Sequence, residues 1–270
     1  MKKIILGLLV ILVFSLVACS KENTRLEKVL EKGKLVIITS PDYAPFEFID
    51  PSKTGDDKYI GADIELMKYI AKELGVSLKL EVADFNTTLA SLALGTVDLA
   101  ISGYTYEDER AENYELSIPY YNEGKQGVLV LKENYENLNT KEKLNTNIKI
   151  GAQAGSMQAD YVSQLENAKL ENFLAIPDGI TALDSKIISG ISISKKVANI
   201  IMEKHPQKYE FVEGVFEVDE ESTAMYVIAK KNETLLIEKI NEIIEKVVAE
   251  GLYAIWDEEA TIKAIELGLL

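Results

Sequence analysis

Residues 33–41 read Gly-Lys-Leu-Val-Ile-Ile-Thr-Ser-Pro, and they are the clearest indication of fold class in the chain. β-Branched residues dominate the centre of this run, and a glycine and a proline bound it, which predicts a buried strand over 34–39. Residues 64–74 follow with the apolar spacing of a helix that ends at Gly75, and residues 78–82 return to a strand pattern. A strand, a helix and a second strand in this order are typical of an α/β protein.

Helix-like and strand-like stretches keep alternating after residue 82. The further elements that their spacing predicts are helices over 87–94, 157–165 and 233–250 and strands over 97–102, 127–131, 148–153 and 225–229. One helix-then-strand template occurs in both halves of the chain, as Leu-x-x-Gly-x-x-Asp over 92–98 and as Leu-x-x-Lys-x-x-Ser over 183–189. This repeat predicts two lobes of similar construction.

Composition excludes several classes of protein. The chain has 270 residues, of which 47% are hydrophobic and 27% charged, and this is the balance of a folded protein. The formal net charge of −15 argues against nucleic-acid binding, because an acidic surface repels phosphate backbones. One cysteine and one histidine argue against a disulfide scaffold, a Cys/His zinc site or a histidine-dependent nucleophile. We therefore expect no metal and no cofactor.

The first eighteen residues have the features of a signal peptide. Lys2 and Lys3 precede an apolar run over 4–18 that is short for a transmembrane helix. The run ends in Leu-Val-Ala-Cys at residues 16–19, which resembles the lipobox of bacterial lipoproteins. The resemblance implies that the thiol of Cys19, the only cysteine, receives the lipid. The alternative is a short buried helix with a free cysteine in the core.

Residues 19–32 would then form the lipid anchor and a tether. Removal of residues 1–18 removes two lysines and no acid, so the mature charge is 27 minus 44, or −17. Acyl chains rather than surface charge would hold such a protein at an anionic membrane. The sequence predicts an exported, membrane-anchored lipoprotein, in the periplasm or on the outer cell surface.

Six short stretches follow one another in the mature chain. They are Ser-Pro-Asp-Tyr-Ala-Pro-Phe-Glu-Phe (40–48), Gly-Ala-Asp-Ile-Glu-Leu (61–66), Ser-Gly-Tyr-Thr-Tyr-Glu-Asp-Glu-Arg (102–110), Leu-Ser-x-Pro-Tyr-Tyr (116–121), Ala-Gly-Ser (154–156) and Gly-Leu-Tyr-x-Ile-Trp (251–256). In this order they resemble the extracellular solute-binding proteins of bacterial ABC importers, in the polar amino-acid branch. The resemblance implies an α/β, two-lobed periplasmic-binding-protein-like (type II) fold with a ligand cleft between the lobes and a two-strand hinge.

The same resemblance implies a division of the chain and a function. Lobe 1 would comprise residues 33–123 and 224–270, and lobe 2 residues 124–223, with the hinge near 121–126 and 220–225. The protein would close over an amino acid or a similar carboxylate-bearing solute and deliver it to the permease of an ABC transporter. We expect a monomer whose membrane contact is made through the lipid anchor.

Arg110 is the main candidate for binding a ligand carboxylate. Its guanidinium is planar and always charged, which suits bidentate pairing with a carboxylate. Within the same segment, Gly103 would let the backbone approach the ligand, Thr105 would donate its hydroxyl and amide hydrogens, and Ser102 would lie beside them. The alternative for Arg110 is a surface pair with Glu109 or Glu112.

Lobe 2 is expected to contribute Ser156 and Met157, which open a helix after the strand over 148–153. Free N–H groups at such a helix start favour a carboxylate, although Ser156 also suits an ordinary helix cap. By resemblance, Tyr43 and Phe85 correspond to aromatic residues that sandwich the side chain of the ligand. Aromatic walls supply a large contact area at a small entropic cost.

Ser194 departs from the family, which carries an acid there to pair with the ammonium group of the ligand. A hydroxyl compensates an ammonium group poorly, and an unpaired buried charge is costly. Three interpretations remain open. The ligand lacks a free ammonium group, another carboxylate such as Glu107 replaces the missing one, or Ser189-Gly190 is the matching turn and the register differs.

Two other functions stay open on this scaffold. Some relatives of the fold are dehydratases of cyclic carboxylic acids, and this chemistry needs a general acid in the cleft. Glu107 is the unusual acid near the expected site. A ligand sensor without transport is the third possibility. We predict a binding protein and not an enzyme.

Overall fold

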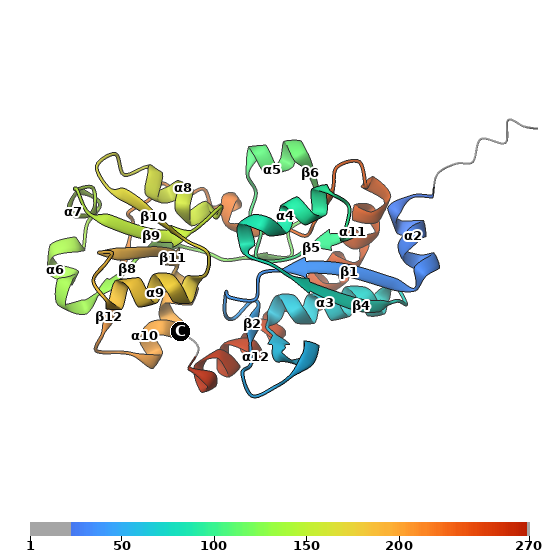
Figure 1. Cartoon of the computed structure of the whole chain (residues 1–270), viewed down its shortest axis with the longest axis horizontal. Helices are drawn as coiled ribbons and strands as arrows, with labels where there is room; N and C mark the ends of the chain where they lie inside the picture. Colours follow the sequence, from blue (N-terminus) through green and yellow to red (C-terminus); the bar gives the residue numbers. More distant parts are fainter. Residues whose placement is uncertain (1–22, 269–270) are drawn as a thin grey trace, which may run out of the picture.

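The computed structural model describes residues 23–268, apart from the side chains of Glu220 and Glu221, and it contains two α/β lobes side by side (Figure 1). The two-lobed α/β fold class is therefore confirmed. The signal peptide and Cys19 lie outside the described residues. No helix within the described range is long and apolar enough to span a membrane.

Lobe 1 is built on a five-stranded sheet in the order β4-β1-β5-β14-β6. β1 runs parallel to β4 and β5, and β14 runs antiparallel to β5 and β6. The strands are β1 (Lys34–Thr39), β4 (Ser77–Val82), β5 (Leu99–Ala100), β6 (Tyr114–Leu116) and β14 (Ile228–Lys230), with a hairpin of β2 (Phe48–Ile49) and β3 (Tyr59–Ile60). The helices are α2 (Arg25–Lys32), α3 (Ala62–Glu73), α4 (Phe85–Ala93), α5 (Asp108–Asn113), α11 (Thr234–Ala249) and α12 (Leu252–Leu267).

Lobe 2 repeats this plan with a sheet in the order β10-β9-β11-β8-β12. Its strands are β8 (Gln126–Leu131), β9 (Lys149–Gln153), β10 (Lys169–Phe173), β11 (Gly190–Ser194) and β12 (Tyr209–Glu213). Its helices are α6 (Tyr135–Leu138), α7 (Lys141–Leu144), α8 (Met157–Ser163), α9 (Ile176–Asp184) and α10 (Lys195–Lys204). In each lobe three neighbouring strands are parallel, and the two strands at one side of the sheet form antiparallel pairs.

The chain crosses between the lobes twice, and the two crossings pair with each other. β7 (Tyr121–Asn122) and β13 (Ala224–Met225) form a two-stranded antiparallel ribbon. The strand expected over 225–229 is therefore wrong as one element, because its first part belongs to this ribbon and its second part is β14. The strand expected over 97–102 is also shorter, since only Leu99 and Ala100 pair with β1 before the chain turns toward the cavity described below.

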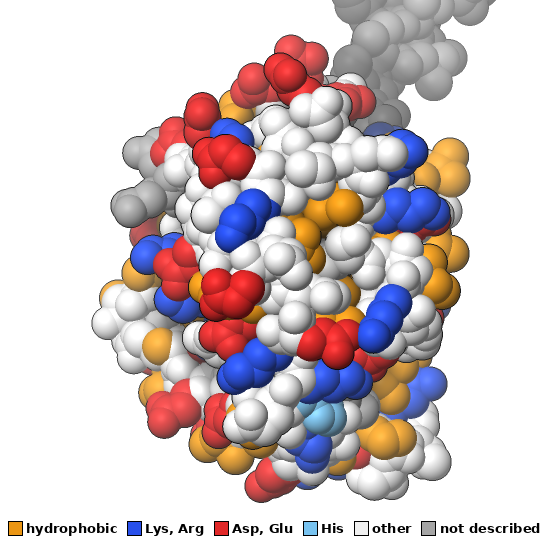
Figure 2. Space-filling model, turned by 90° about the vertical axis from the view of Figure 1, so that its left-hand side faces the viewer, with side chains coloured by type: hydrophobic (Ala, Val, Ile, Leu, Met, Phe, Trp, Pro, Cys, Tyr) orange, Lys and Arg blue, Asp and Glu red, His pale blue; other side chains and the backbone are white. Residues whose placement is uncertain are grey.

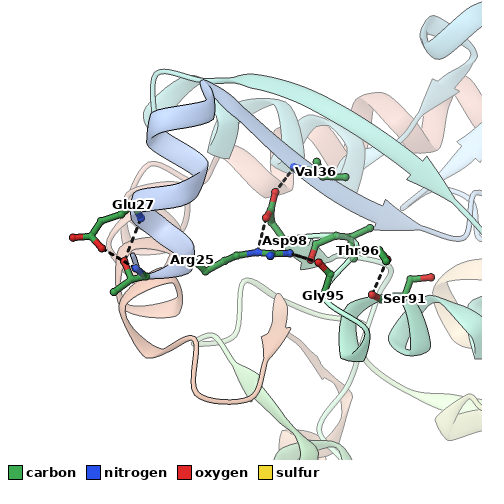
Figure 3. A network of polar contacts seen from close by, with 9 residues as sticks. Arg25, Glu27, Val36, Ser91, Gly95, Thr96 and Asp98 are labelled. Carbon is green, nitrogen blue, oxygen red and sulfur yellow. Dashed lines mark hydrogen bonds and ion pairs between the residues drawn. The ribbon is translucent and has the colours of Figure 1, made fainter. Parts of the chain in front are cut away.

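Residues 25–32 do not form a tether. They form helix α2, which begins with a capping box in which Glu27 N donates to Thr24 Oγ1 at 3.2 Å and Thr24 N donates to Glu27 Oε2 at 2.7 Å. The helix packs on lobe 1 through the buried Val29. Arg25 fastens its start, with Nε 2.6 Å from Asp98 Oδ1 and Nη2 donating to Gly95 O at 2.9 Å (Figure 3). Residues 25–32 are therefore part of folded lobe 1.

The described surface of lobe 2 carries both signs of charge. Figure 2 looks onto this end of the molecule and shows acidic and basic side chains interspersed. Lobe 2 contains surface pairs such as Lys149–Glu171, with 2.8 Å between Nζ and Oε2. Mixed charge of this kind favours solubility and gives no continuous basic track for a polyanion on the face shown.

Candidate functional site

A small cavity lies between the two lobes. Its walls are Tyr43, Glu47, Phe85, Ser102, Gly103, Thr105 and Arg110 from lobe 1, Glu123 from the crossing, and Gln153, Ser156, Met157 and Gln158 from lobe 2. Its free volume is only about 20 Å³. Residues of both lobes therefore lie close together around the site.

Of the nine residues expected to bind ligand, eight line this cavity: Tyr43, Phe85, Ser102, Gly103, Thr105, Arg110, Ser156 and Met157. Ser194 lies beside it, with Oγ 3.3 Å from the Tyr43 hydroxyl. The two aromatic walls are supported from behind, since Phe46 packs against Tyr43 and Tyr104 stacks on Phe85 at 5.0 Å between ring centroids. Packing of this kind limits the rings to one orientation.

Arg110 is buried at the cavity wall, with only 5% of its surface exposed. Nη1 donates to the Thr105 carbonyl, and Nη2 lies 3.0 Å from Glu107 Oε1. The surface pair with Glu109 or Glu112 is therefore not adopted. Among the described residues Nε has no hydrogen-bond partner. Buried N–H groups normally have hydrogen-bond acceptors, so a buried guanidinium with an unpaired N–H favours binding of an acceptor from outside the protein.

Asp63 orders the loop that carries the lobe 1 contacts. This carboxylate is buried at the start of α3, and Gly103 N donates to its Oδ2 at 2.9 Å. Tyr120 and Tyr253 donate their hydroxyls to it at 3.0 and 2.6 Å. The positive φ of 59° at Gly103 belongs to this turn, where a glycine is accommodated without strain. The position of the loop thus depends on three donors that converge on one carboxylate.

Glu47 is a second buried acid in the same network. Its Oε1 accepts a hydrogen bond from Ser102 Oγ at 2.8 Å, and its Oε2 has no hydrogen-bond partner among the described residues. Burial raises the pKa of Glu47 well above 4.5, and the nearby negative charge of Asp63 raises it further. Burial also raises the pKa of Asp63. Burial therefore disfavours the charged form of both carboxyls.

Glu47→Gln is expected to flatten the dependence of stability on pH. A carboxyl whose pKa is raised on folding contributes full stability below its ordinary pKa of 4.5 and loses that stability as pH rises toward the raised value. One such proton corresponds to about 1.4 kcal/mol per pH unit. Glutamine keeps an acceptor for Ser102 but has no carboxyl to titrate. Urea unfolding from pH 5 to 8 measures the slope, and an unchanged slope in the variant contradicts the raised pKa of Glu47. Glu65→Gln, an exposed acid on α3, is the control.

The lobe 2 wall is ordered by local caps. Ser156 Oγ accepts from Ala159 N at 3.3 Å and donates to Gln153 O at 2.7 Å, so this hydroxyl caps α8. Ser194 caps α10 in the same way, accepting from Val197 N at 3.3 Å. Ser194 ends β11, and Ser189 precedes that strand. Whether Ser189-Gly190 or Ser194 matches the family position stays open, because this depends on an alignment with relatives and not on the strand bounds.

Asp42 joins the lobes at the edge of the cavity. Its Oδ2 accepts from Gln153 Nε2 at 2.8 Å and from Ile176 N at 3.2 Å, both in lobe 2. Ser40 Oγ donates to the other oxygen at 2.7 Å. Burial raises the pKa of Asp42, because the carboxylate loses hydration when the lobes meet. These contacts stabilise the observed arrangement of the two lobes.

Four lining residues were not expected from the sequence: Glu47, Glu123, Gln153 and Gln158. Glu123 lies in the predicted hinge segment, and the absence of an acid at Ser194 is the sequence signal that points to a carboxylate elsewhere near the site. Glu107, the carboxylate that the sequence suggests, does not line the cavity. It lies in a separate depression with Asn86 and Asn113.

Two lobes that enclose a small polar cavity define a two-lobed binding protein. The chain matches the bacterial extracellular solute-binding proteins, family 3, over residues 35–259, and it belongs to this family. It is 28% identical over 241 residues to a probable histidine-binding protein of Campylobacter jejuni, covering 88% of this chain and 90% of that one. It is also 28% identical over 241 residues to the arginine-binding extracellular protein ArtP of Bacillus subtilis, covering 88% and 89%.

Solved structures give the same result for the fold. An amino acid ABC transporter substrate-binding protein of Streptococcus pneumoniae, bound to L-arginine, superimposes with a TM-score of 0.80 at 32% identity. The alignment covers 88% of this chain and 98% of that one. A cyclohexadienyl dehydratase of Pseudomonas aeruginosa is 30% identical over 112 residues, but this match covers only 42% of the chain and 40% of the dehydratase.

Proposed function

We propose that the protein is an extracellular receptor that captures an amino acid by closure of its two lobes. The observation that carries this proposal is the buried Arg110 in the wall of the interlobe cavity. Its Nε has no hydrogen-bond partner among the described residues. The ligand carboxylate would pair with Arg110 and with Thr105 of lobe 1. Met157 and Ser156 would close on it from lobe 2, and Tyr43 and Phe85 would flank the rest of the ligand. Relatives that bind amino acids support the same class of solute.

In this proposal the protein is exported and anchored to the membrane by a lipid on Cys19. It would deliver the bound solute to the permease of an ABC transporter. The β7–β13 ribbon would act as the hinge, because it is the paired connection through which the chain passes between the lobes. Helix α2 is docked on lobe 1, so the tether between Cys19 and the folded protein would be only a few residues long. Lobe 1 would then lie close to the membrane. The protein would act as a monomer.

Thermal unfolding of the purified mature protein with a panel of free amino acids tests the receptor function. A ligand at about 100 times its Kd is expected to add about 2.7 kcal/mol to the free energy of unfolding. The matching amines, which lack the carboxylate, are expected to have no effect, because Arg110 then has no acceptor. Amides of the same amino acids serve as the control for ligand size. A panel in which no amino acid stabilises the protein contradicts the proposal.

We infer binding without turnover. The relatives that match most of the chain are named as binding proteins, whereas the dehydratase match covers only 42% of it. Glu107, the acid considered from the sequence, pairs with Arg110 and does not line the cavity. Burial raises the pKa of Glu107, and Arg110 opposes this rise. The ligand is expected to be recovered unchanged after prolonged incubation. Release of product would favour the enzyme instead.

A further inference from the structure

Glu123 is a buried acid at the junction of the hinge and the cavity. It follows β7, and its backbone N–H donates to Thr223 O at 3.0 Å, next to β13. Only 5% of its surface is exposed, and its side chain lines the interlobe cavity. Any movement of the hinge therefore moves this carboxylate relative to the cavity.

The hydrogen-bond donors to Glu123 are all neutral. Tyr43 of lobe 1 donates its hydroxyl to Oε1. From lobe 2, Gln126 and Gln158 donate Nε2 to Oε2 at 3.2 and 3.4 Å. Because donors from both lobes converge on one carboxylate, this arrangement exists only in the closed form.

No cation lies within ion-pair distance of Glu123 in the part of the chain that the structure describes. Three lysines share a neighbouring depression with it, but each pairs with another acid. Lys125 and Lys195 pair with Glu213, and Lys196 lies 2.6 Å from Asp257 Oδ2. The carboxylate is thus buried, hydrogen-bonded and not neutralised by a protein cation.

A buried carboxylate without a counter-charge is electrostatically unfavourable. Burial is the main cause of the raised pKa of Glu123, and a cation bound in the cavity would offset it. Glu47 also lines the cavity, but the nearby negative charge of Asp63 further disfavours an anion there. The cavity wall therefore contains Arg110, a cation with spare donors, and Glu123, a carboxyl that donors from both lobes surround and no protein cation pairs with.

We propose that Glu123 is the counter-charge for the ammonium group of the bound amino acid. This inference rests on the proposed receptor function. It assigns a protein partner to the ammonium group, whereas Arg110 would bind the carboxylate. Ser194 and Tyr43 lie beside Glu123 and would accept further ammonium hydrogens through their hydroxyl oxygens. Because Glu123 follows the hinge ribbon directly, the ammonium group would be bound where the two lobes and the crossing meet.

Glu123→Gln tests the assignment, with a stabilising amino acid and its deaminated analogue as probes in titration calorimetry. Removal of one partner of a buried charge pair is expected to weaken binding of the amino acid by about 100-fold or more. Binding of the deaminated analogue is expected to be unchanged or tighter, because glutamine is neutral. A purely structural role for Glu123 would weaken both ligands alike, so an unchanged ratio of the two affinities overturns the proposal.

Two further variants make the test sharper. Glu213→Gln removes the same charge from an acid that pairs with two lysines outside the cavity, and it is expected to leave both affinities unchanged. Ser194→Asp in the Glu123→Gln background returns a carboxylate beside Tyr43, and aspartate caps a helix as well as serine does. This double variant is expected to recover at least ten-fold of the lost affinity for the amino acid, and no recovery contradicts the assignment.

The failure of this inference is distinguishable from the failure of the receptor function. If wild-type protein binds no amino acid, the receptor function fails and the inference fails with it. If wild-type protein binds an amino acid and Glu123→Gln binds it equally well, the receptor function stands and only the assignment of Glu123 is overturned.

Discussion

Arg110→Ala is expected to weaken binding of the amino acid by about 100-fold or more, the range typical of a truncated buried charge pair. Within residues 23–268 no other arginine or lysine lines the cavity, so no cation remains to receive the carboxylate. Arg110→Lys keeps the charge but loses the planar fork. It is expected to retain part of the affinity. Titration calorimetry with the amino acid found in the panel measures both variants.

Arg25→Ala is the matched control for this prediction. Arg25 also belongs to lobe 1 and is largely buried against an acid, with Arg25 and Asp98 side chains 19% and 11% exposed. It holds α2 against lobe 1 and does not contact the cavity (Figure 3). Its loss is expected to lower the free energy of unfolding and leave affinity unchanged. If Arg110→Ala binds as well as Arg25→Ala, the carboxylate is bound elsewhere.

Local pattern was sufficient to predict much of the fold. The strand over 34–39 is β1 as expected, because a short apolar run rich in β-branched residues between a glycine and a proline favours a strand over a helix. The two expected strands that changed, over 97–102 and 225–229, lie where the chain leaves a sheet for the cavity or the hinge. Their apolar character reflects burial, but burial near a crossing does not require strand pairing.

Helix α2 is the reverse case, a regular element where the sequence analysis expects none. Its residues follow the expected lipid anchor and are expected to form a tether, although Thr-x-x-Glu at 24–27 is the signature of a capping box at a helix start. Among the site residues, Arg110 and Thr105 follow from their motif. Glu123 does not, because its role depends on three side chains distant in sequence, Tyr43, Gln126 and Gln158, that meet it only after both lobes have folded.

Gly61→Ala is expected to prevent stable folding of lobe 1. Gly61 precedes α3 with φ 133°, a conformation that L side chains rarely adopt. A Cβ there would lie 2.1 Å from Phe46 O and 2.9 Å from Glu47 Cα, and both are backbone atoms that cannot move aside as a flexible side chain does. The same Phe46 carbonyl accepts from Asp63 N at 2.9 Å, so displacement of this backbone also disturbs the carboxylate that orders Gly103.

The expected loss of stability is therefore far above that of an ordinary glycine replacement. Gly55→Ala is the matched control, because Gly55 also has positive φ, 63°, but has nothing within 4 Å of the added Cβ. A left-handed alanine alone costs about 1–2 kcal/mol. Urea unfolding is expected to show that modest loss for Gly55→Ala and a loss of about 4 kcal/mol or more, or no folded protein, for Gly61→Ala. Equal losses in the two variants would mean that the backbone around Phe46 moves to accommodate the added methyl group. The close approach of Gly61 to Phe46 would then not determine the position of the Gly103 turn.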